Sequence, residues 1–388
     1  MSVILLKNCD VFSPEPMGVR DVFVAGEKIV AVEERIPVPI GFPVAVIDAS
    51  GLRLTPGFVD NHVHIAGAGG EGGPATRTTD LRLSQLLSGG ITSVIGCLGA
   101  DGMTRSVESV LMKAKALREE GVSAWILTGA YQVPPPTILG DVGKDIALIE
   151  EVIGTGEIAI ADHRSSFPTA EELIRIAVHS RVGGMLGGKA GIVNLHLGEA
   201  ENPFALLREV VAKSELKFTQ FLPTHCNRNS SIFEDAKIYG REGYVDITTS
   251  SYLFFPKYEI KPAKSIRELT EAGVPIEHIT FSSDGCGSLP HFDEKGNLVK
   301  LVSGEPASLL TEFRDAVLEE GVPLETALRV VASNPAAIFK LPGKGRVAAG
   351  YDADLLLLDE NLTIVHMLAR GVPMVRNGEI IHREKLGT

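Results

Sequence analysis

Eight short apolar segments alternate with helical segments through the middle of this chain, and this alternation restricts the possible folds more than any other feature. Helical patterns such as SVLMKAKALREEG and AEELIRIAVHS separate several of the apolar segments. Repeated strand–helix units favour an α/β fold with parallel strands, and eight of them predict a (β/α)8 TIM-like barrel. The expected strands lie at residues 57–61, 92–97, 124–128, 152–161, 192–196, 220–224, 245–249 and 279–283.

The two ends of the chain have a different pattern, which they share with each other. Both carry short apolar segments separated by proline, glycine and charged residues, as is typical of strands joined by tight turns. Near the C-terminus, Arg376-Asn377-Gly378 predicts a hairpin turn. We therefore expect residues 1–55 and 337–388 to form the two parts of one small β-sandwich domain, and residues 56–336 to form the barrel.

Charge and composition exclude several classes of protein. The 388 residues are 44% hydrophobic and 22% charged, which is ordinary for a globular chain with a large core. Acidic residues outnumber basic ones 49 to 37 and no basic run could follow a phosphate backbone, so we expect no nucleic-acid partner. The first apolar run is too short for a signal sequence, and no segment approaches the ~18 apolar residues of a membrane span. We predict a cytoplasmic protein with no membrane partner.

The four cysteines, at positions 9, 97, 226 and 286, are far apart in the sequence and form no C-x-x-C pair. This spacing indicates neither a disulfide framework nor a zinc ribbon. Cys226 and Cys286 lie beside candidate site residues, but small apolar core side chains are the simpler interpretation of the cysteines.

Two histidines one residue apart follow the first predicted strand, in PGFVDNHVH. Side chains two positions apart in a strand share a face, so His62 and His64 can present both imidazoles to one metal ion. His196 and His225 also close apolar segments, and a single such histidine is more often a hydrogen-bonded core residue. Four histidines and Asp284 at the same end of successive strands instead favour a metal site at the mouth of the barrel.

Five such ligands exceed the three that a single catalytic zinc usually takes, so we expect two metal ions that share a bridging hydroxide. Two cations held close together need an anionic bridge, which must come from a further carboxylate.

Other polar residues close the same strands. Arg164 and Arg228 are either surface ion-pair partners or bidentate ligands for substrate carboxylates. Tyr131 is either an aromatic lid contact or a phenol that reaches over the mouth. Asp162 and His163 are expected to support the metal ligands rather than to join them.

Two further candidates lie in loops. Glu71, in the glycine-rich loop after His64, is either a solvated charge or a partner for a substrate amine. Ser288 follows the eighth predicted strand and is expected at the same mouth.

The sequence resembles the amidohydrolase superfamily and, within it, the isoaspartyl dipeptidases. The general superfamily features are PGFVDNHVH, the histidines after strands five and six, the aspartate after strand eight, and GYDADLLLLD. More specific signatures extend over nearly the whole chain: GGEGGPATRT, EEGVSAWILTGAYQVP, ADHRSS, SRVGGMLGGKAGIVNLHLG, LPTHCNRN and SSDGCGSLPHFDEKGNL.

This resemblance implies a zinc metallo-dipeptidase that hydrolyses β-aspartyl (isoaspartyl) dipeptides with two zinc ions per subunit. His62, His64 and Asp284 would hold one metal, while His196 and His225 would hold the other. The resemblance also implies a homo-oligomer. The expected substrate-pocket residues are Glu71, Tyr131, Arg164, Arg228 and Ser288.

Two positions differ from the family pattern. The family's bridging ligand is a carbamylated lysine at the end of strand four, where this chain has Glu157. A glutamate also presents a carboxylate but is several bonds shorter, so we expect Glu157 to bridge the metals. Ala100 stands where the family often has a threonine near the substrate, so one hydrogen bond is expected to be lost.

The expected mechanism uses a metal-activated hydroxide without an acyl-enzyme. Tyr131 would stabilise the oxyanion, and Asp284 would carry a proton to the leaving amine. Two alternatives stay open: an N-acyl-amino-acid or cyclic-amide hydrolase on the same scaffold, and a non-catalytic amidohydrolase-like scaffold.

Overall fold

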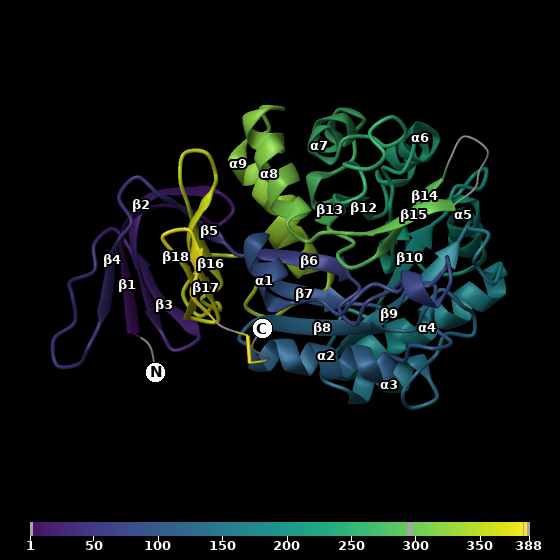
Figure 1. The fold of residues 1–388 in the computed structure, drawn as a ribbon, viewed down its shortest axis with the longest axis horizontal. Helices are drawn as coiled ribbons and strands as arrows, with labels where there is room; N and C mark the ends of the chain where they lie inside the picture. The colour runs from purple at the N-terminus through teal and green to yellow at the C-terminus, as the bar shows by residue number, and fades with distance from the viewer. Residues whose placement is uncertain (1–2, 293–297, 383, 386–388) are drawn as a thin grey trace.

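The computed structural model describes residues 3–292, 298–382, 384 and 385. Two regions lie side by side in it (Figure 1). Purple and yellow strands from the two ends of the chain meet in the smaller region, and the middle of the chain forms the larger one. Segments at opposite ends of the sequence therefore share one structural unit.

A nine-stranded sheet brings the two ends of the chain together. Its order is β19-β18-β17-β16-β5-β1-β2-β3, with β4 also paired to β1. The junction is β5, which lies parallel to β1 and antiparallel to β16. The sandwich arrangement and the domain boundaries stay predictions. The strands are β1 (Val3–Phe12), β2 (Pro16–Ala25), β3 (Lys28–Glu33), β4 (Ala45–Asp48), β5 (Arg53–Pro56), β16 (Leu355–Leu358), β17 (Ile364–Ala369), β18 (Val372–Arg376) and β19 (Glu379–Ile380).

The expected hairpin turn near the C-terminus is confirmed. Arg376 pairs with Glu379, so Asn377 and Gly378 alone make the connection between β18 and β19. Both have positive φ, 50° and 79°. This is the combination that a two-residue hairpin turn of the primed type requires, and asparagine followed by glycine adopts it at low cost.

Strand β16 attaches the chain-end sheet to the rest of the molecule. Its four leucines are all buried, and successive side chains in a strand point to opposite faces. Leu355 and Leu357 pack in the core of the chain-end sheet. Leu356 and Leu358 pack on the other face, in the cluster that contains Phe58 of the larger region. The run LLLL is therefore a strand that is buried on both sides.

The larger region contains parallel strands in sequence order. Strands β6 to β11 form one sheet, β12 pairs with β13, and a bridge between Val63 and Gly285 brings the last strand back to the first. Each predicted segment overlaps one strand, an arrangement consistent with a (β/α)8 barrel. The strands are β6 (Phe58–Val63), β7 (Ile91–Gly96), β8 (Ser123–Thr128), β9 (Val152–Ile160), β10 (Ile192–Leu197), β11 (Phe221–Thr224), β12 (Val245–Thr248) and β13 (Ile279–Ser282).

Helices follow most of these strands, and β13 is followed by the hairpin of β14 (Ser288–Phe292) and β15 (Leu298–Ser303). The α-helices are α1 (Leu83–Ser88), α2 (Val107–Glu119), α3 (Val142–Leu148), α4 (Ala170–Gly187), α5 (Ala205–Lys213), α6 (Ser230–Tyr239), α7 (Pro262–Glu271), α8 (Ser308–Leu318), α9 (Leu324–Leu328) and α10 (Asn334–Ile338). Short turns of other helix types are η1 (Pro74–Thr76), η2 (Phe218–Gln220), η3 (Ile276–His278) and η4 (Arg329–Ser333).

The helix ends follow local sequence signals. Helix α4 begins with a capping box, in which Thr169 and Glu172 satisfy each other's backbone N–H groups, and Gly188 ends it in the left-handed conformation. Across the described ranges, no helix combines the length and apolar character needed to cross a bilayer.

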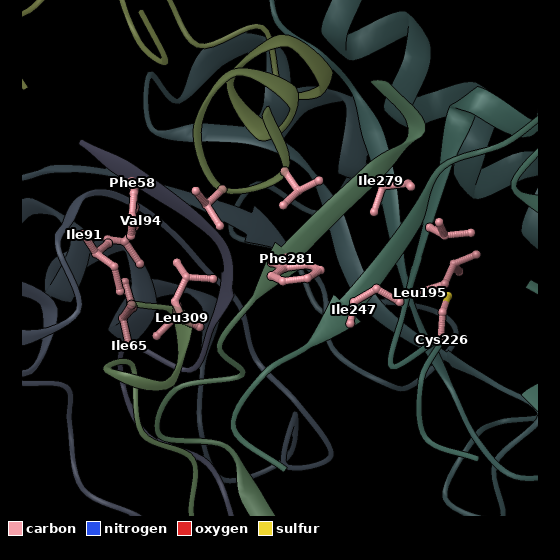
Figure 2. Packing of buried hydrophobic residues seen from close by; sticks show 14 of the residues in the cluster. Phe58, Ile65, Ile91, Val94, Leu195, Cys226, Ile247, Ile279, Phe281 and Leu309 are labelled. Carbon is pink, nitrogen blue, oxygen red and sulfur yellow. The ribbon is translucent and has the colours of Figure 1, made fainter. Parts of the chain in front are cut away.

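Alternation along the barrel strands separates the apolar core from a polar interior. Ile279 and Phe281 of β13 lie in the core, where Figure 2 shows Phe281 near Ile247 of β12. Thr280 and Ser282 face the other way, and both donate hydrogen bonds to the buried carboxylate of Asp246. Strand β13 thus packs one face in the apolar core and turns polar side chains to the other, whereas strands β6 to β11 also carry apolar side chains of a second cluster.

Candidate metal centre

The ends of four strands bring the predicted histidines together. His62 and His196 are the next-to-last residues of β6 and β10. His64 and His225 come directly after β6 and β11. Ring centroids are 5.4 Å apart for His62 and His64, and 4.7 Å apart for His196 and His225. All four side chains are buried. Asp284, after β13, joins this group, with Oδ1 3.1 Å from His64 Nε2.

Glu157 lies at the centre of these ligands. Its Oε2 is 3.4 Å from Nε2 of His62 and 3.8 Å from Nε2 of His64. Its Oε1 is 2.8 Å from Nδ1 of His196 and 3.3 Å from Nε2 of His225. Each oxygen of one carboxylate therefore faces one pair of histidines.

A β-bulge in β9 explains how the short glutamate side chain reaches this position. Thr155 is opposite Val193 of β10, but Ile158 is opposite Leu195, so Gly156 and Glu157 together face the single residue Asn194. A bulge of this kind redirects a side chain. Only glycine fits before Glu157, because a Cβ on Gly156 would lie 2.7 Å from the carbonyl oxygen of Asn194. The bulge thus accompanies the orientation of Glu157 toward the histidines.

Two buried oxygen atoms support the view that this group holds cations. Glu157 Oε2 and Asp284 Oδ1 have no hydrogen-bond donor within the described part of the chain. Such buried polar atoms need a partner, which a cation can supply. Burial alone would raise the pKa of Glu157, but the charges of His62 and His196 outweigh it and lower the pKa well below its usual range. Burial alone would raise the pKa of Asp284, but the nearby imidazole of His64 outweighs this effect and lowers the pKa below its usual value.

Cys97, directly after β7, belongs to the same group and was not predicted as a site residue. Its Sγ lies 3.8 Å from Nε2 of His62 and 3.9 Å from Nδ1 of His64. Donor atoms of Cys97, both histidines and Glu157 all lie within 4.8 Å of one another, and so do those of Glu157, His196 and His225. The signal was available in the sequence, since Cys97 closes an apolar segment as the histidines do. Cys97 packs in an apolar cluster with Val59 and Ile95, as expected of a core side chain, and its sulfur also faces the two histidines.

The other cysteines that lie beside predicted site residues do pack as apolar side chains. Cys226 and Cys286 both belong to the buried hydrophobic cluster, and Figure 2 shows Cys226 close to Leu195. Burial raises the pKa of the Cys286 thiol to about 12. Neither thiol is part of the metal-ligand groups described above.

A cavity of about 1400 Å³ opens above the ligands. The five residues predicted for the substrate pocket all line it, and so does Ala100 at the position where a threonine was expected. Glu71 is held in place there: it accepts hydrogen bonds from Ser288 Oγ at 2.9 Å and 3.0 Å and from Arg164 Nη1 at 3.4 Å. Ser288 thus orients Glu71 in the structure.

The two arginines of the cavity differ in their partners. Arg164 donates to both carboxylate oxygens of Asp162, at 3.0 Å and 2.8 Å, and Asp162 Oδ2 lies 2.9 Å from His196 Nε2. Arg228 donates to the carbonyl oxygen of Leu197 at 2.9 Å, and in the described ranges it has no carboxylate within 4.0 Å. His163 is largely exposed and lies away from the ligands. Arg228 is therefore the arginine with unused hydrogen-bonding capacity.

The surroundings of Tyr131 and of His225 shift the pKa of each side chain. Burial and the charge of Glu157 raise the pKa of Tyr131 well above its usual range, so its phenol is a neutral donor. Its Oη lies 2.7 Å from His196 Nδ1. Burial and the nearby guanidinium of Arg228 lower the pKa of His225 to about 3. A neutral imidazole is the form that binds metal.

Known proteins resemble this chain in sequence and in structure. The model of the family described as "Amidohydrolase family" matches residues 256–382. The chain is 42% identical to a beta-aspartyl dipeptidase from Fervidobacterium islandicum AW-1 whose structure contains the beta-Asp-Leu dipeptide, with 99% of this chain and 100% of that chain covered and a TM-score of 0.91.

More distant relatives match over most of the chain. An allantoinase from Enterococcus faecalis is 23% identical over 92% of this chain and 87% of its own length. A dihydropyrimidinase from Brevibacillus agri is 15% identical, with 99% of this chain and 97% of that chain covered, and has a TM-score of 0.68, a likeness that shows the fold alone.

Proposed function

The chain belongs to the beta-aspartyl dipeptidases of the amidohydrolase family and is a hydrolase, and we propose that it cleaves β-aspartyl dipeptides at a two-metal centre. The observation that carries the proposal is the position of Glu157 between two pairs of histidines, beneath a cavity that presents Glu71 and Arg228. The shared carboxylate supports two cations, and the cavity supports a zwitterionic substrate.

The residues fit such a centre. His62, His64 and Asp284 would hold one metal, His196 and His225 the other, and Glu157 both. Imidazole and carboxylate donors suit zinc, which we propose as the metal, two ions per subunit. When bound, a metal pair of this kind polarises a carbonyl and makes water a stronger nucleophile near neutral pH.

Substrate recognition in this proposal depends on charge. A β-aspartyl dipeptide carries two carboxylates and one free amine. Glu71, fixed by Ser288, would bind the amine, and Arg228 would bind a carboxylate because its guanidinium has no carboxylate partner in the described ranges. Arg164 would bind the second carboxylate through the edge of its guanidinium group that carries Nη1, which faces Glu71 in the structure. The net charge of −12 does not prevent this, because outer charges are screened beyond about 8 Å at physiological salt.

One side chain would stabilise the negative charge that develops on the scissile carbonyl oxygen, and another would transfer the proton of the attacking water. The neutral phenol of Tyr131 can donate a hydrogen bond to the oxygen of the scissile carbonyl as negative charge builds there. Asp284, a carboxylate at the cavity floor, can accept the proton of the attacking water and return it to the leaving amine.

The substrate is tested by comparing three dipeptides with the purified protein: β-Asp-Leu, α-Asp-Leu and N-acetyl-β-Asp-Leu. We expect hydrolysis of the first alone at appreciable rate, because the acetylated peptide lacks the free amine that Glu71 would bind, and α-Asp-Leu has its peptide bond at the other carboxyl group of aspartate. Equal turnover of the acetylated peptide would favour an N-acyl-amino-acid hydrolase. Turnover of allantoin instead would favour the cyclic-amide alternative, which the similarity to an allantoinase keeps open. A zinc-loaded protein that hydrolyses none of these compounds would indicate a scaffold.

Replacing Arg228 tests the carboxylate contact directly. In Arg228→Met the apolar stem is kept and the charged hydrogen bonds are lost, so kcat/KM for β-Asp-Leu should fall by about 100-fold. Arg208→Met is the control, since Arg208 pairs with Asp235 outside the cavity and should leave kcat/KM unchanged. Unchanged kinetics in Arg228→Met would refute the contact. The proposed homo-oligomer can be measured by light scattering on the same samples.

A further inference from the structure

The surroundings of Cys97 are those of a ligand. In the cluster that surrounds it, the thiol sulfur faces two imidazoles, and the residue is fully buried. Cys97 also packs against apolar side chains, as do Cys226 and Cys286, but of these three thiols it alone belongs to a group of potential metal donors in the described ranges. We propose that Cys97 is a thiolate ligand of the metal held by His62 and His64, an inference that rests on the proposed two-metal centre.

The distances between the donor atoms match those around a tetrahedral ion. Donors at about 2.0–2.3 Å from zinc lie roughly 3.3–3.8 Å from each other. His62 Nε2 is 3.4 Å from Glu157 Oε2 and 3.8 Å from Cys97 Sγ, and His64 Nε2 is 3.8 Å from Glu157 Oε2. One donor atom from each of His62, His64, Cys97 and Glu157 lies within 4.8 Å of the others.

A second observation points to a cation in the same space. Oε2 of Glu157 is the oxygen that faces His62 and His64, and it has no hydrogen-bond donor in the described ranges, although Glu157 is completely buried. Asp284 Oδ1, beside His64, is in the same situation. The sulfur of Cys97 and the unpaired Oε2 of Glu157 thus lie in one group of donor atoms with His62 and His64.

The proposal also gives Cys97 a chemical role in this particular chain. A thiolate ligand adds one negative charge beside a bridging carboxylate that is shorter than a carbamylated lysine. With Cys97 bound, the ion on the His62 side has four protein donors before Asp284 is counted. Asp284 is then free to exchange protons. Thiolates also prefer zinc to magnesium or manganese, so this position should select a soft divalent ion.

Cobalt substitution of the full chain tests the proposal without relying on activity. A cysteine thiolate bound to Co²⁺ gives an intense near-ultraviolet charge-transfer band that imidazole and carboxylate ligands do not give. We expect this band in the wild type and in Cys9→Ser, whose buried thiol lies in the chain-end sheet, and its loss in Cys97→Ser. Cys97→Ser should also lose one of its two ions faster than the wild type during dialysis against a weak chelator.

X-ray absorption of the zinc-loaded wild type keeps the test independent of whether the variant folds. A sulfur at about 2.3 Å from zinc is expected, whereas nitrogen and oxygen ligands lie at about 2.0–2.2 Å. Two bound ions with no sulfur contact would overturn the role of Cys97 and leave the proposed two-metal function standing. A protein that binds no Co²⁺ or Zn²⁺ would overturn both.

Discussion

Glu157 is the residue on which both halves of the proposed centre depend. Its carboxylate lies within 4.0 Å of all four histidines. Glu157→Gln keeps the volume of the side chain but removes the charge between the two cations. We expect the metal content to fall from two ions per subunit to one or fewer and kcat to fall by at least about 100-fold. Metal analysis after dialysis, with circular dichroism as a check of folding, measures this.

A matched control for this change is Glu259→Gln. Glu259 is a partly buried glutamate that also lines the cavity, but it accepts a hydrogen bond from Ser251 rather than facing the histidines. Its variant should keep two ions per subunit. If Glu157→Gln also kept both ions, the carboxylate would not be the bridge.

At this scale the sequence predicted which histidines and which aspartate lie close together, but not the hydrogen bonds around them. The histidines and Asp284 could be found because each closes an apolar strand, and strand ends meet at one mouth. Cys97 closes a strand too, but a cysteine in an apolar run carries no pattern that separates a ligand from core filler. The bonds from Ser288 to Glu71 and from Arg164 to Asp162 were not predictable, because they depend on loop conformations that no periodicity encodes.

At the scale of elements, strand β9 shows that the hydrophobic pattern of a sequence can predict a strand without predicting which way each side chain points. The segment 152–161 was predicted as a strand and is one, from Val152 to Ile160. The direction of Glu157, however, depends on one extra residue relative to β10. A shift of one residue turns a side chain to the opposite face of a sheet, and the sequence alone does not reveal the partner strand's register.

Helices α7 and α8 are joined by a carboxyl group whose charge should matter to stability. Glu312 of α8 accepts a hydrogen bond from the backbone N–H of Ala263, at the start of α7, at 2.9 Å. Burial raises the pKa of Glu312 from 4.5 to about 7. The folded state therefore holds this proton more tightly than the unfolded state. The stability that this provides is fully present below about pH 4.5 and is lost as the pH rises through about 7.

Glu312→Gln removes this titration and keeps an acceptor for the Ala263 N–H group. Relative to the wild type, the variant should gain about 2–3 kcal/mol in free energy of unfolding between about pH 5 and about pH 9. Urea titrations at the two pH values measure the difference. If the difference in free energy of unfolding between variant and wild type did not change with pH, Glu312 would not be protonated in the folded protein at low pH.

At the scale of the whole molecule, the segments from the two ends of the chain contact the barrel strands around β16 and Lys344. The leucines of β16 pack on both sides, toward the chain-end sheet and toward the barrel. Beside them the ammonium of Lys344, which is 2% exposed, contacts Asp352 at 2.8 Å, Ser123 of β8 at 2.6 Å, and Asp354. A buried charge thus links the C-terminal segment to a barrel strand, far from the metal ligands.

Lys344→Met should destabilise the molecule strongly, because it leaves the carboxylates of Asp352 and Asp354 close together without their buried cation. Removing one partner of a buried pair costs about 3–5 kcal/mol. Lys28→Met is the matched control: Lys28 also pairs with Asp352, but about half of its side chain is exposed, so its loss should cost at most about 1 kcal/mol. Urea unfolding of both variants measures the contrast. Since the proposed metal ligands are untouched, folded Lys344→Met should keep its full metal content. Equal losses of stability in Lys344→Met and Lys28→Met would show that Lys344 does not join the chain ends to the barrel.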